Sequence, residues 1–253
     1  MLATQIHGAP GAAPPLLIAH GLFGSGRNWG VIAKRLADRG EVIAVDMRNH
    51  GDSPWTERHD YPGMAGDLAE VIEARGGPAD VAGHSMGGKA AMVLALTRPE
   101  LVRRLVVADI APVAYGHSQS RNIEAMRAVD LSRVEKRSDA AEQLAPRLDA
   151  PELVSFFTQS LDLRQKRWRL NLDVLARDMP LILGFPEEIE GRFEGPALFL
   201  SGAESDYVRP EHRDRIKALF PAARFAKIPG AGHWLHADKP REFEAALRAF
   251  LDA

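Results

Sequence analysis

The chain has 253 residues and a formal net charge of −2 at pH 7; 45% of its residues are hydrophobic and 26% are charged. This near-neutral balance is typical of a globular domain and gives no electrostatic basis for binding nucleic acid or an anionic membrane surface. The sequence contains no cysteine, which excludes disulfides, thiolate catalysis and cysteine-ligated zinc.

The first residues, MLATQIHGAP, have neither the basic nor the apolar region of a signal peptide. No uninterrupted apolar run reaches the roughly 18 residues that a membrane-spanning helix needs. We therefore expect a soluble, cytoplasmic protein with no membrane insertion. The sequence makes no prediction of the oligomeric state.

Short apolar runs alternate with longer helical patterns, which is typical of a mostly parallel sheet flanked by crossover helices. The residues before Pro10 are a candidate edge strand. The expected buried strands are 16–19, 42–45, 79–82, 105–108, 197–200 and 224–228. The expected helices include 28–39, 64–75, 89–96 and 240–251. A chain of this length fills one α/β domain, so we expect a single domain over 1–253.

The interval 112–195 breaks this alternation, because it is long, rich in Arg, Glu, Gln and Ala, and shows no convincing strand. An unstructured loop of that length is improbable inside a compact domain. We therefore expect several helices inserted before the penultimate strand, forming a cap over one end of the sheet. Its expected inward-facing residues are Phe156, Phe157, Trp168, Leu170, Leu172 and Leu175. The basic stretch RQKRWR at 164–169 is interpreted as a solvated helix face with one aromatic anchor, since the near-neutral chain does not favour a nucleic-acid patch.

The stretch VAGHSMGGKA at 81–90 fits two motifs that both need a strand, a tight turn and then a helix. As G-x-S-x-G it presents Ser85 as a nucleophile, and as G-x-x-x-x-G-K it matches most of a phosphate-binding loop. Ala90 stands where the phosphate loop needs a hydroxyl for Mg²⁺, which disfavours the nucleotide interpretation. If Ser85 is a nucleophile, the chain must also supply a general base, an acid and backbone amides that bind the oxyanion, and candidates for each are present.

Ser85 needs a general base, and the base needs an acid that fixes its tautomer. His233 lies in a glycine-bearing loop after the last expected strand, at the same sheet edge as Ser85. Asp109 and Asp206 both follow strands in the chain order serine, acid, histidine, so position does not separate them. His236 forms an H-x-x-H pair with His233 but lacks the other features of a zinc site, so we expect no metal.

The backbone amides that stabilise the oxyanion are expected at Met86, directly after the nucleophile, and in the glycine-rich loop after strand 16–19. In that loop, HGLFGSG at 20–26, Leu22 is the first choice of donor and Phe23 the second. One such donor is typically worth about 10²–10³ in rate. His20 is interpreted as a structural hydrogen-bonding residue rather than a second base.

Six stretches spread over nearly the whole chain carry a family resemblance. They are HGLFGS, DMRNHGDS, GHSMGGKAAM, VVADIAPV, WRLNLD and GHWLHADKP. With them the sequence resembles the α/β-hydrolase superfamily, most closely the YbfF-type esterase group and its related mitochondrial α/β-hydrolase-domain proteins. The resemblance implies an α/β-hydrolase fold in which the loop Arg48-Asn49-His50-Gly51 braces the site. Lys89, which follows the G-x-S-x-G motif, is interpreted as a helix-surface residue.

The same resemblance favours Asp109 as the triad acid, because in this group the acid follows the strand before the cap. In the wider superfamily the acid usually follows the penultimate strand, often three residues after a glycine. Counted from Gly202, that position is Ser205, and Asp206 comes one residue later. Asp206 therefore remains the alternative acid.

Together these residues predict a serine carboxylic-ester hydrolase that works through a Ser85–His233–Asp109 triad and an acyl-enzyme, without a cofactor. The expected partner is a small-molecule ester with a short- to medium-chain acyl group. Its expected binding residues are Phe23, Phe156, Trp168 and Trp234. Thioester hydrolysis, perhydrolysis and carbon–carbon hydrolysis remain open, since the fold alone does not select the reaction. A receptor-like ligand-binding protein on the hydrolase scaffold is the alternative of a different class.

Overall fold

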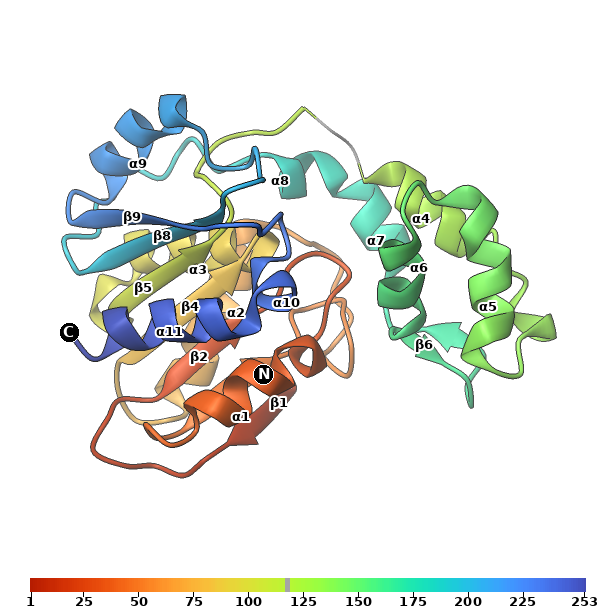
Figure 1. The fold of residues 1–253 in the computed structure, drawn as a ribbon, viewed down its shortest axis with the longest axis horizontal. Helices are drawn as coiled ribbons and strands as arrows, with labels where there is room; N and C mark the ends of the chain where they lie inside the picture. Colours follow the sequence, from red (N-terminus) through yellow and green to blue (C-terminus); the bar gives the residue numbers. More distant parts are fainter. Residues whose placement is uncertain (117–118) are drawn as a thin grey trace.

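A seven-stranded sheet forms the centre of the computed structural model, which describes residues 1–116 and 119–253 (Figure 1). The strands lie in the order β1-β3-β2-β4-β5-β8-β9, with β1 antiparallel at one edge and the others parallel. Their bounds are β1 Thr4–His7, β2 Leu16–Ala19, β3 Val42–Val45, β4 Ala79–His84, β5 Val102–Ala108, β8 Ala197–Gly202 and β9 Ala223–Ile228. The six predicted parallel strands and the edge strand before Pro10 are confirmed.

Helices cover both faces of this sheet, as the alternation of strands and helices predicts. One face carries α1 Gly30–Leu36, α10 Leu235–Asp238 and α11 Pro240–Leu251, and the other carries α2 Tyr61–Glu73, α3 Met86–Thr97 and α9 Arg213–Leu219. Short 3-10 turns join these elements, namely η1 Gly26–Trp29, η2 Pro99–Leu101 and η5 Pro210–His212. The expected helix 28–39 is therefore divided between η1 and α1. In the described residues, no helix is long and apolar enough to cross a membrane.

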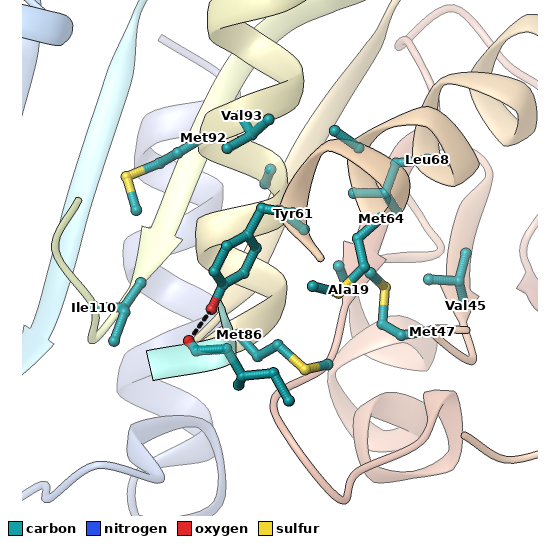
Figure 2. Packing of buried hydrophobic residues seen from close by; sticks show 14 of the residues in the cluster. Ala19, Val45, Met47, Tyr61, Met64, Leu68, Met86, Met92, Val93 and Ile110 are labelled. Atoms are coloured by element: carbon teal, nitrogen blue, oxygen red, sulfur yellow. Dashed lines mark hydrogen bonds between the residues drawn. The ribbon is translucent and has the colours of Figure 1, made fainter. Parts of the chain in front are cut away.

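Two apolar clusters on opposite faces of the sheet hold the helices in place. Along β2, Leu17 belongs to the cluster under α2 and α3, whereas Leu16 belongs to the cluster under α1 and α11. Figure 2 shows Met64 of α2 and Met86 of α3 among the buried residues of the first cluster. Tyr61 in this cluster also donates a hydrogen bond of 2.5 Å to the Ile182 carbonyl. Burial on both faces explains why the central strands β2 and β3 are uninterrupted apolar runs in the sequence.

The segment between β5 and β8 contains the predicted helical insert. Its elements are α4 Ser120–Arg127, η3 Leu131–Arg133, α5 Arg137–Leu144, η4 Ala145–Arg147, α6 Pro151–Thr158, α7 Leu172–Arg177 and α8 Met179–Leu183. In Figure 1, α4 to α7 lie to one side of the sheet. Of the expected inward-facing residues, all but the half-buried Phe156 are buried. We keep 112–195 as the proposed extent of the cap; residues 117 and 118 of this range lie outside the described residues.

The expectation that the insert contains no strand is wrong. Two short strands, β6 Leu161–Asp162 and β7 Arg167–Trp168, pair in antiparallel fashion. The stretch 164–169 is therefore part of a hairpin and not a helix face, and Lys166 in its turn has φ +50°. Asp162 Oδ1 accepts hydrogen bonds from two backbone amides of this turn, at 3.1 Å each. Aspartate favours turns through such bonds, and the hydrophobic pattern of the sequence does not reveal this preference.

Candidate active site

Ser85 stands in the sharp turn between β4 and α3, with backbone angles φ +51° and ψ −119°. This conformation is unfavourable for a residue with a side chain, and the surrounding chain holds it, since the Ser85 amide donates to the Ala108 carbonyl at 3.0 Å. A Cβ on Gly83 would lie 2.3 Å from the Gly87 carbonyl oxygen, and one on Gly87 would lie 2.4 Å from that of Ala19. Close main-chain packing therefore requires both glycines of the G-x-S-x-G motif.

His233 and Asp109 form a hydrogen-bonded chain with Ser85. His233 Nε2 lies 3.1 Å from Ser85 Oγ, and His233 Nδ1 lies 2.8 Å from Asp109 Oδ2. Asp109 is fully buried directly after β5 with φ +52°, and His233 lies in the loop after β9. A carboxylate at this distance keeps the proton on Nδ1, which leaves Nε2 facing Ser85 Oγ as a hydrogen-bond acceptor.

The two candidate acids lie in different surroundings. Asp206 is exposed, and its backbone carbonyl accepts a hydrogen bond from Arg209 Nε. Ser205 instead reaches Asp109, because its hydroxyl donates to Asp109 Oδ2 at 2.5 Å, while the Gly202 amide donates to Oδ1 at 3.1 Å. Ser205 thus occupies the position where the wider superfamily often has its acid, and there it donates a hydrogen bond to the carboxylate of Asp109.

Two residues that were not predicted to belong to the site, His84 and Tyr207, hold His233 in place. His84 Nε2 donates to the backbone carbonyl of His233 at 2.8 Å. The Tyr207 ring stacks on the imidazole, with centroids 3.9 Å apart and planes inclined by 18°. Burial lowers the pKa of His84 well below its usual value, and the nearby His233 lowers it further, so His84 is neutral. The position of His84 directly before Ser85 is a signal available in the sequence, whereas Tyr207 becomes a neighbour only in the folded sheet.

The amides of Met86 and Leu22 are the candidates for binding an oxyanion. Met86 is the first residue of α3, a position whose N–H has no acceptor within the helix. The second-choice donor, Phe23, is excluded because its amide donates to His50 Nε2 at 3.1 Å. Leu22 therefore remains the candidate donor from the glycine-rich loop.

His20 orients the peptide that carries the Leu22 amide. Its Nδ1 donates to the Gly21 carbonyl at 2.7 Å, and its Nε2 accepts from the Met47 amide at 2.9 Å. Burial lowers the pKa of His20 to about 4, although the hydrogen bond to Gly21 opposes this shift. The neutral ring therefore bridges two main-chain segments, and the structural role predicted for His20 is confirmed.

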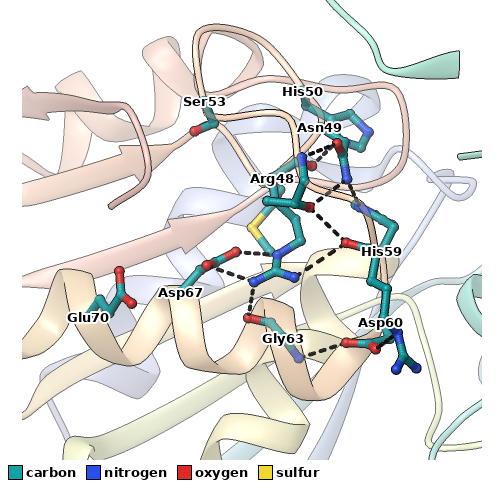
Figure 3. A network of polar contacts seen from close by, with 12 residues as sticks. Arg48, Asn49, His50, Ser53, His59, Asp60, Gly63, Asp67 and Glu70 are labelled. Atoms are coloured by element: carbon teal, nitrogen blue, oxygen red, sulfur yellow. Dashed lines mark hydrogen bonds and ion pairs between the residues drawn. The ribbon is translucent and has the colours of Figure 1, made fainter. Parts of the chain in front are cut away.

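Arg48, Asn49 and His50 form the loop after β3, and their contacts are shown in Figure 3. Arg48 donates to both carboxylate oxygens of Asp67, at 2.6 and 2.9 Å, and to the Gly63 carbonyl at 2.8 Å. His50 Nδ1 donates to the Arg48 carbonyl at 2.9 Å, and burial lowers the pKa of His50 to about 3. The Arg48 contacts join this loop to α2, and the His50 contact is made within the loop. Both agree with the bracing role expected for the loop.

The expectation that Lys89 lies on the helix surface is wrong. Its side chain is 1% exposed, and Nζ donates to the carbonyls of Leu183 and Gly184 at 2.9 and 2.5 Å. Nζ also lies 4.8 Å from the centre of the Tyr115 ring and 5.6 Å from that of Tyr61, within the range of cation–π attraction. Burial lowers the pKa of Lys89 to about 7. Lys89 therefore fastens the end of α8 to the helix that follows Ser85.

A cavity of about 280 Å³ includes Ser85 and His233 in its lining, with walls from both the core and the cap. Three of the predicted substrate-binding residues, Phe23, Phe156 and Trp234, line it. Trp168 does not, which corrects its predicted role: it is buried within the cap, where its Nε1 donates to the Met126 carbonyl at 2.9 Å. An aromatic residue in the cap is able to pack either into the interior of the cap or into the pocket wall. The sequence pattern is the same in both cases and does not distinguish them.

Among the described residues, no group of three or more histidines, aspartates and glutamates is placed to hold a metal ion. His236 stacks on Trp29, with ring centroids 4.1 Å apart. Burial lowers the pKa of His236 to about 3, so its ring is neutral near pH 7. This residue contributes to packing beside the cavity.

Known proteins with similar sequences and structures share this arrangement of elements. A model described as "Alpha/beta hydrolase family" matches residues 16–246. The "sn-1-specific diacylglycerol lipase ABHD11" of Mus musculus is 42% identical, and the match covers 94% of this chain and 81% of the mouse protein. "Esterase YbfF" of Escherichia coli strain K12 is 40% identical, with 94% of this chain and 93% of that protein covered. A solved structure of a "Marine microorganism esterase" has a TM-score of 0.93 and 37% identity, and the match covers 98% of each chain.

These matches confirm the predicted fold, in which a mostly parallel sheet is flanked by helices and a helical insert lies between β5 and β8. They extend from the first parallel strand to the last helix, so they include both the core and the cap. The chain belongs to the alpha/beta hydrolase family.

Proposed function

We propose that this chain is a serine carboxylic-ester hydrolase in which Ser85 is the nucleophile, His233 the general base and Asp109 the acid. The observation that carries the proposal is the continuous chain of hydrogen bonds from Ser85 Oγ through both ring nitrogens of His233 to the buried Asp109. Two relatives with about 40% identity, named as a diacylglycerol lipase and an esterase, support ester hydrolysis as the reaction.

Catalysis begins when His233 Nε2 accepts the proton of Ser85 while Oγ attacks the carbonyl carbon of the ester. The amides of Met86 and Leu22 stabilise the negative charge on the former carbonyl oxygen. His233 then gives its proton to the leaving alcohol as the carbon–oxygen bond breaks, which leaves an acyl group on Ser85. A water molecule, deprotonated by the same imidazole, attacks this acyl-enzyme, and the proton returns to Ser85 as the acid departs.

We further propose that the substrate is a small-molecule ester with a short- to medium-chain acyl group. The cavity volume of about 280 Å³ lies near the lower end of the roughly 300–1,000 Å³ that is usual for ligand pockets. The aromatic rings of Phe23, Phe156 and Trp234 in its lining suit an apolar acyl chain better than a charged one.

The experiment that tests the mechanism combines labelling with turnover. A fluorophosphonate is expected to form a covalent adduct that maps to Ser85, and Ser85→Ala is expected to lose both labelling and hydrolysis of p-nitrophenyl esters. Ser155→Ala, the same substitution at an exposed position of α6, is the matched control and should keep both. An adduct at another residue, or a Ser85→Ala variant with most of the native turnover, would contradict the mechanism.

A series of p-nitrophenyl esters and acyl thioesters of increasing chain length tests the proposed substrate. We expect the highest kcat/KM for short or medium acyl groups on oxygen esters. A clear preference for thioesters would reassign the reaction to a thioesterase. A stoichiometric burst without further turnover would favour the receptor-like alternative.

A further inference from the structure

Phe23, the residue after the proposed oxyanion donor Leu22, is held at three points. Its φ of +64° lies in the left-handed region, which costs free energy for a residue with a Cβ and persists only where neighbours enforce it. Its amide donates to His50 Nε2 at 3.1 Å, and its carbonyl accepts from the Ser160 hydroxyl at 3.2 Å. Its ring packs edge-on against that of Phe157, with centroids 5.4 Å apart. Side chains from other parts of the chain thus fix the peptide groups on both sides of Phe23.

All three restraints lead to the cap. The hydroxyl and the Phe157 ring come from the end of α6 and the turn that follows it. His50 is attached to the cap through an antiparallel β-bridge with Leu170. Main-chain hydrogen bonds of 2.8 and 3.0 Å join residues 49–51 with 169–171 around this bridge. The cap therefore contacts the glycine-rich loop 20–26 directly through the Ser160 hydroxyl and the Phe157 ring, and indirectly through His50.

We propose that Ser160 is a positioning residue that couples the cap to the oxyanion hole through the main chain of Phe23. The proposal rests on the proposed function, because it takes the Leu22 amide as an oxyanion donor. Without the Ser160 hydroxyl, the strained backbone of Phe23 loses one of the contacts that enforce it. The Gly24 amide lies in the same peptide group as the Phe23 carbonyl and donates to the Gly21 carbonyl at 3.0 Å, so a shift there reaches the Gly21–Leu22 peptide that carries the Leu22 amide. A shift of about 1 Å at a group that stabilises the transition state is enough to lower the rate substantially.

Ser160 is not among the residues that line the cavity, so its effect on substrate binding is expected to be small. This separates a positioning role from a binding role, because a donor used only in the transition state affects kcat more than KM. It also predicts that inhibitors mimicking the tetrahedral intermediate are weakened in parallel with kcat.

The test compares three variants on p-nitrophenyl butyrate. Ser160→Ala removes the hydroxyl, and Ser160→Thr keeps it. Gln159→Ala is the matched control, because Gln159 accepts a hydrogen bond of 3.0 Å from Asn28 and so joins the same cap segment to a different residue of the core. We expect Ser160→Ala to lower kcat about tenfold with KM nearly unchanged, and to weaken a trifluoromethyl ketone inhibitor by a similar factor. Ser160→Thr and Gln159→Ala should both stay near wild type.

A folded Ser160→Ala variant with native kcat, a change confined to KM, or an equal loss in Gln159→Ala would overturn the role of Ser160. If Ser160→Ala does not fold, Ser160→Cys replaces it, since a thiol keeps the shape but donates only weakly. Fluorophosphonate labelling of the wild type separates this proposal from the one on which it rests. An unlabelled wild type refutes the proposed function, whereas a labelled wild type with native turnover in Ser160→Ala refutes only the coupling.

Discussion

Replacement of Asp109 by Asn is expected to reverse the tautomer of His233. The Gly202 amide, 3.1 Å from Asp109 Oδ1, is able only to donate, so the single amide oxygen of Asn takes the position beside it. The Asn NH₂ group then faces His233 Nδ1, which is 2.8 Å from the carboxylate in the native protein, and forces this nitrogen to accept. The ring proton moves to Nε2, 3.1 Å from Ser85 Oγ, and Nε2 no longer accepts the serine proton. We expect kcat to fall by about 10⁴, or ~5 kcal/mol of transition-state stabilisation.

The assay is kcat and KM for p-nitrophenyl butyrate near neutral pH, with thermal unfolding as the check of folding. Asp206→Asn makes the same change at an exposed carboxylate and is expected to stay close to the wild type. The tautomer argument is refuted if a folded Asp109→Asn variant keeps more than about a tenth of the native kcat, since the expected loss is far larger. A large loss in Asp206→Asn would instead assign the acid to that residue.

Three further substitutions test individual contacts. Burial lowers the pKa of Lys89 from 10.5 to about 7, so between these values the unfolded chain binds more protons than the folded one, and this group makes the protein more stable as the pH rises. In urea unfolding, the wild type should therefore gain about 2 kcal/mol between pH 7 and 9 relative to Lys89→Met, and parallel pH profiles would contradict this. Ser205→Ala removes the hydroxyl that donates to Asp109 and should lower kcat about tenfold at nearly constant KM; an unchanged kcat would show that the hydroxyl is dispensable. Trp168→Phe removes the hydrogen bond to Met126 and should lower the free energy of unfolding by about 1–2 kcal/mol, whereas a raised KM for short esters would return Trp168 to the substrate pocket.

The strands and the candidate nucleophile and base were predictable because each depends on local sequence. Strands buried on both faces are uninterrupted apolar runs, so their positions follow from hydrophobicity alone. The carboxyl ends of parallel strands meet at one edge of the sheet, and this places Ser85 and His233 near each other once the strand order is known. The choice between Asp109 and Asp206 was not local, because both follow strands and differ only in which loops surround them.

The errors concern residues whose surroundings are set by distant parts of the chain. Lys89 looks like a surface residue in its helix, but the carbonyl of Leu183, 94 residues away, accepts its hydrogen bond. Trp168 looks like a pocket residue, but its partner Met126 lies 42 residues earlier, within the cap. The hairpin at 161–168 is too short for its alternation to stand out. A local sequence pattern indicates the environment that a side chain usually prefers. For Lys89 and Trp168, the actual environment is set by residues far away in the sequence.

The insertion of the cap between β5 and β8 has a consequence for how activity appears during folding. Asp109 and Gly202, which meet in the site, are 93 residues apart in the chain. Closing a disordered loop of that length costs conformational entropy, and the cost is smaller once the intervening residues have formed α4 to α8, because the effective loop is then shorter. We therefore expect the cap helices to form before β8 joins β5. In a refolding experiment, helical signal should then return before esterase activity, and the recovery of turnover would mark the closing of the sheet.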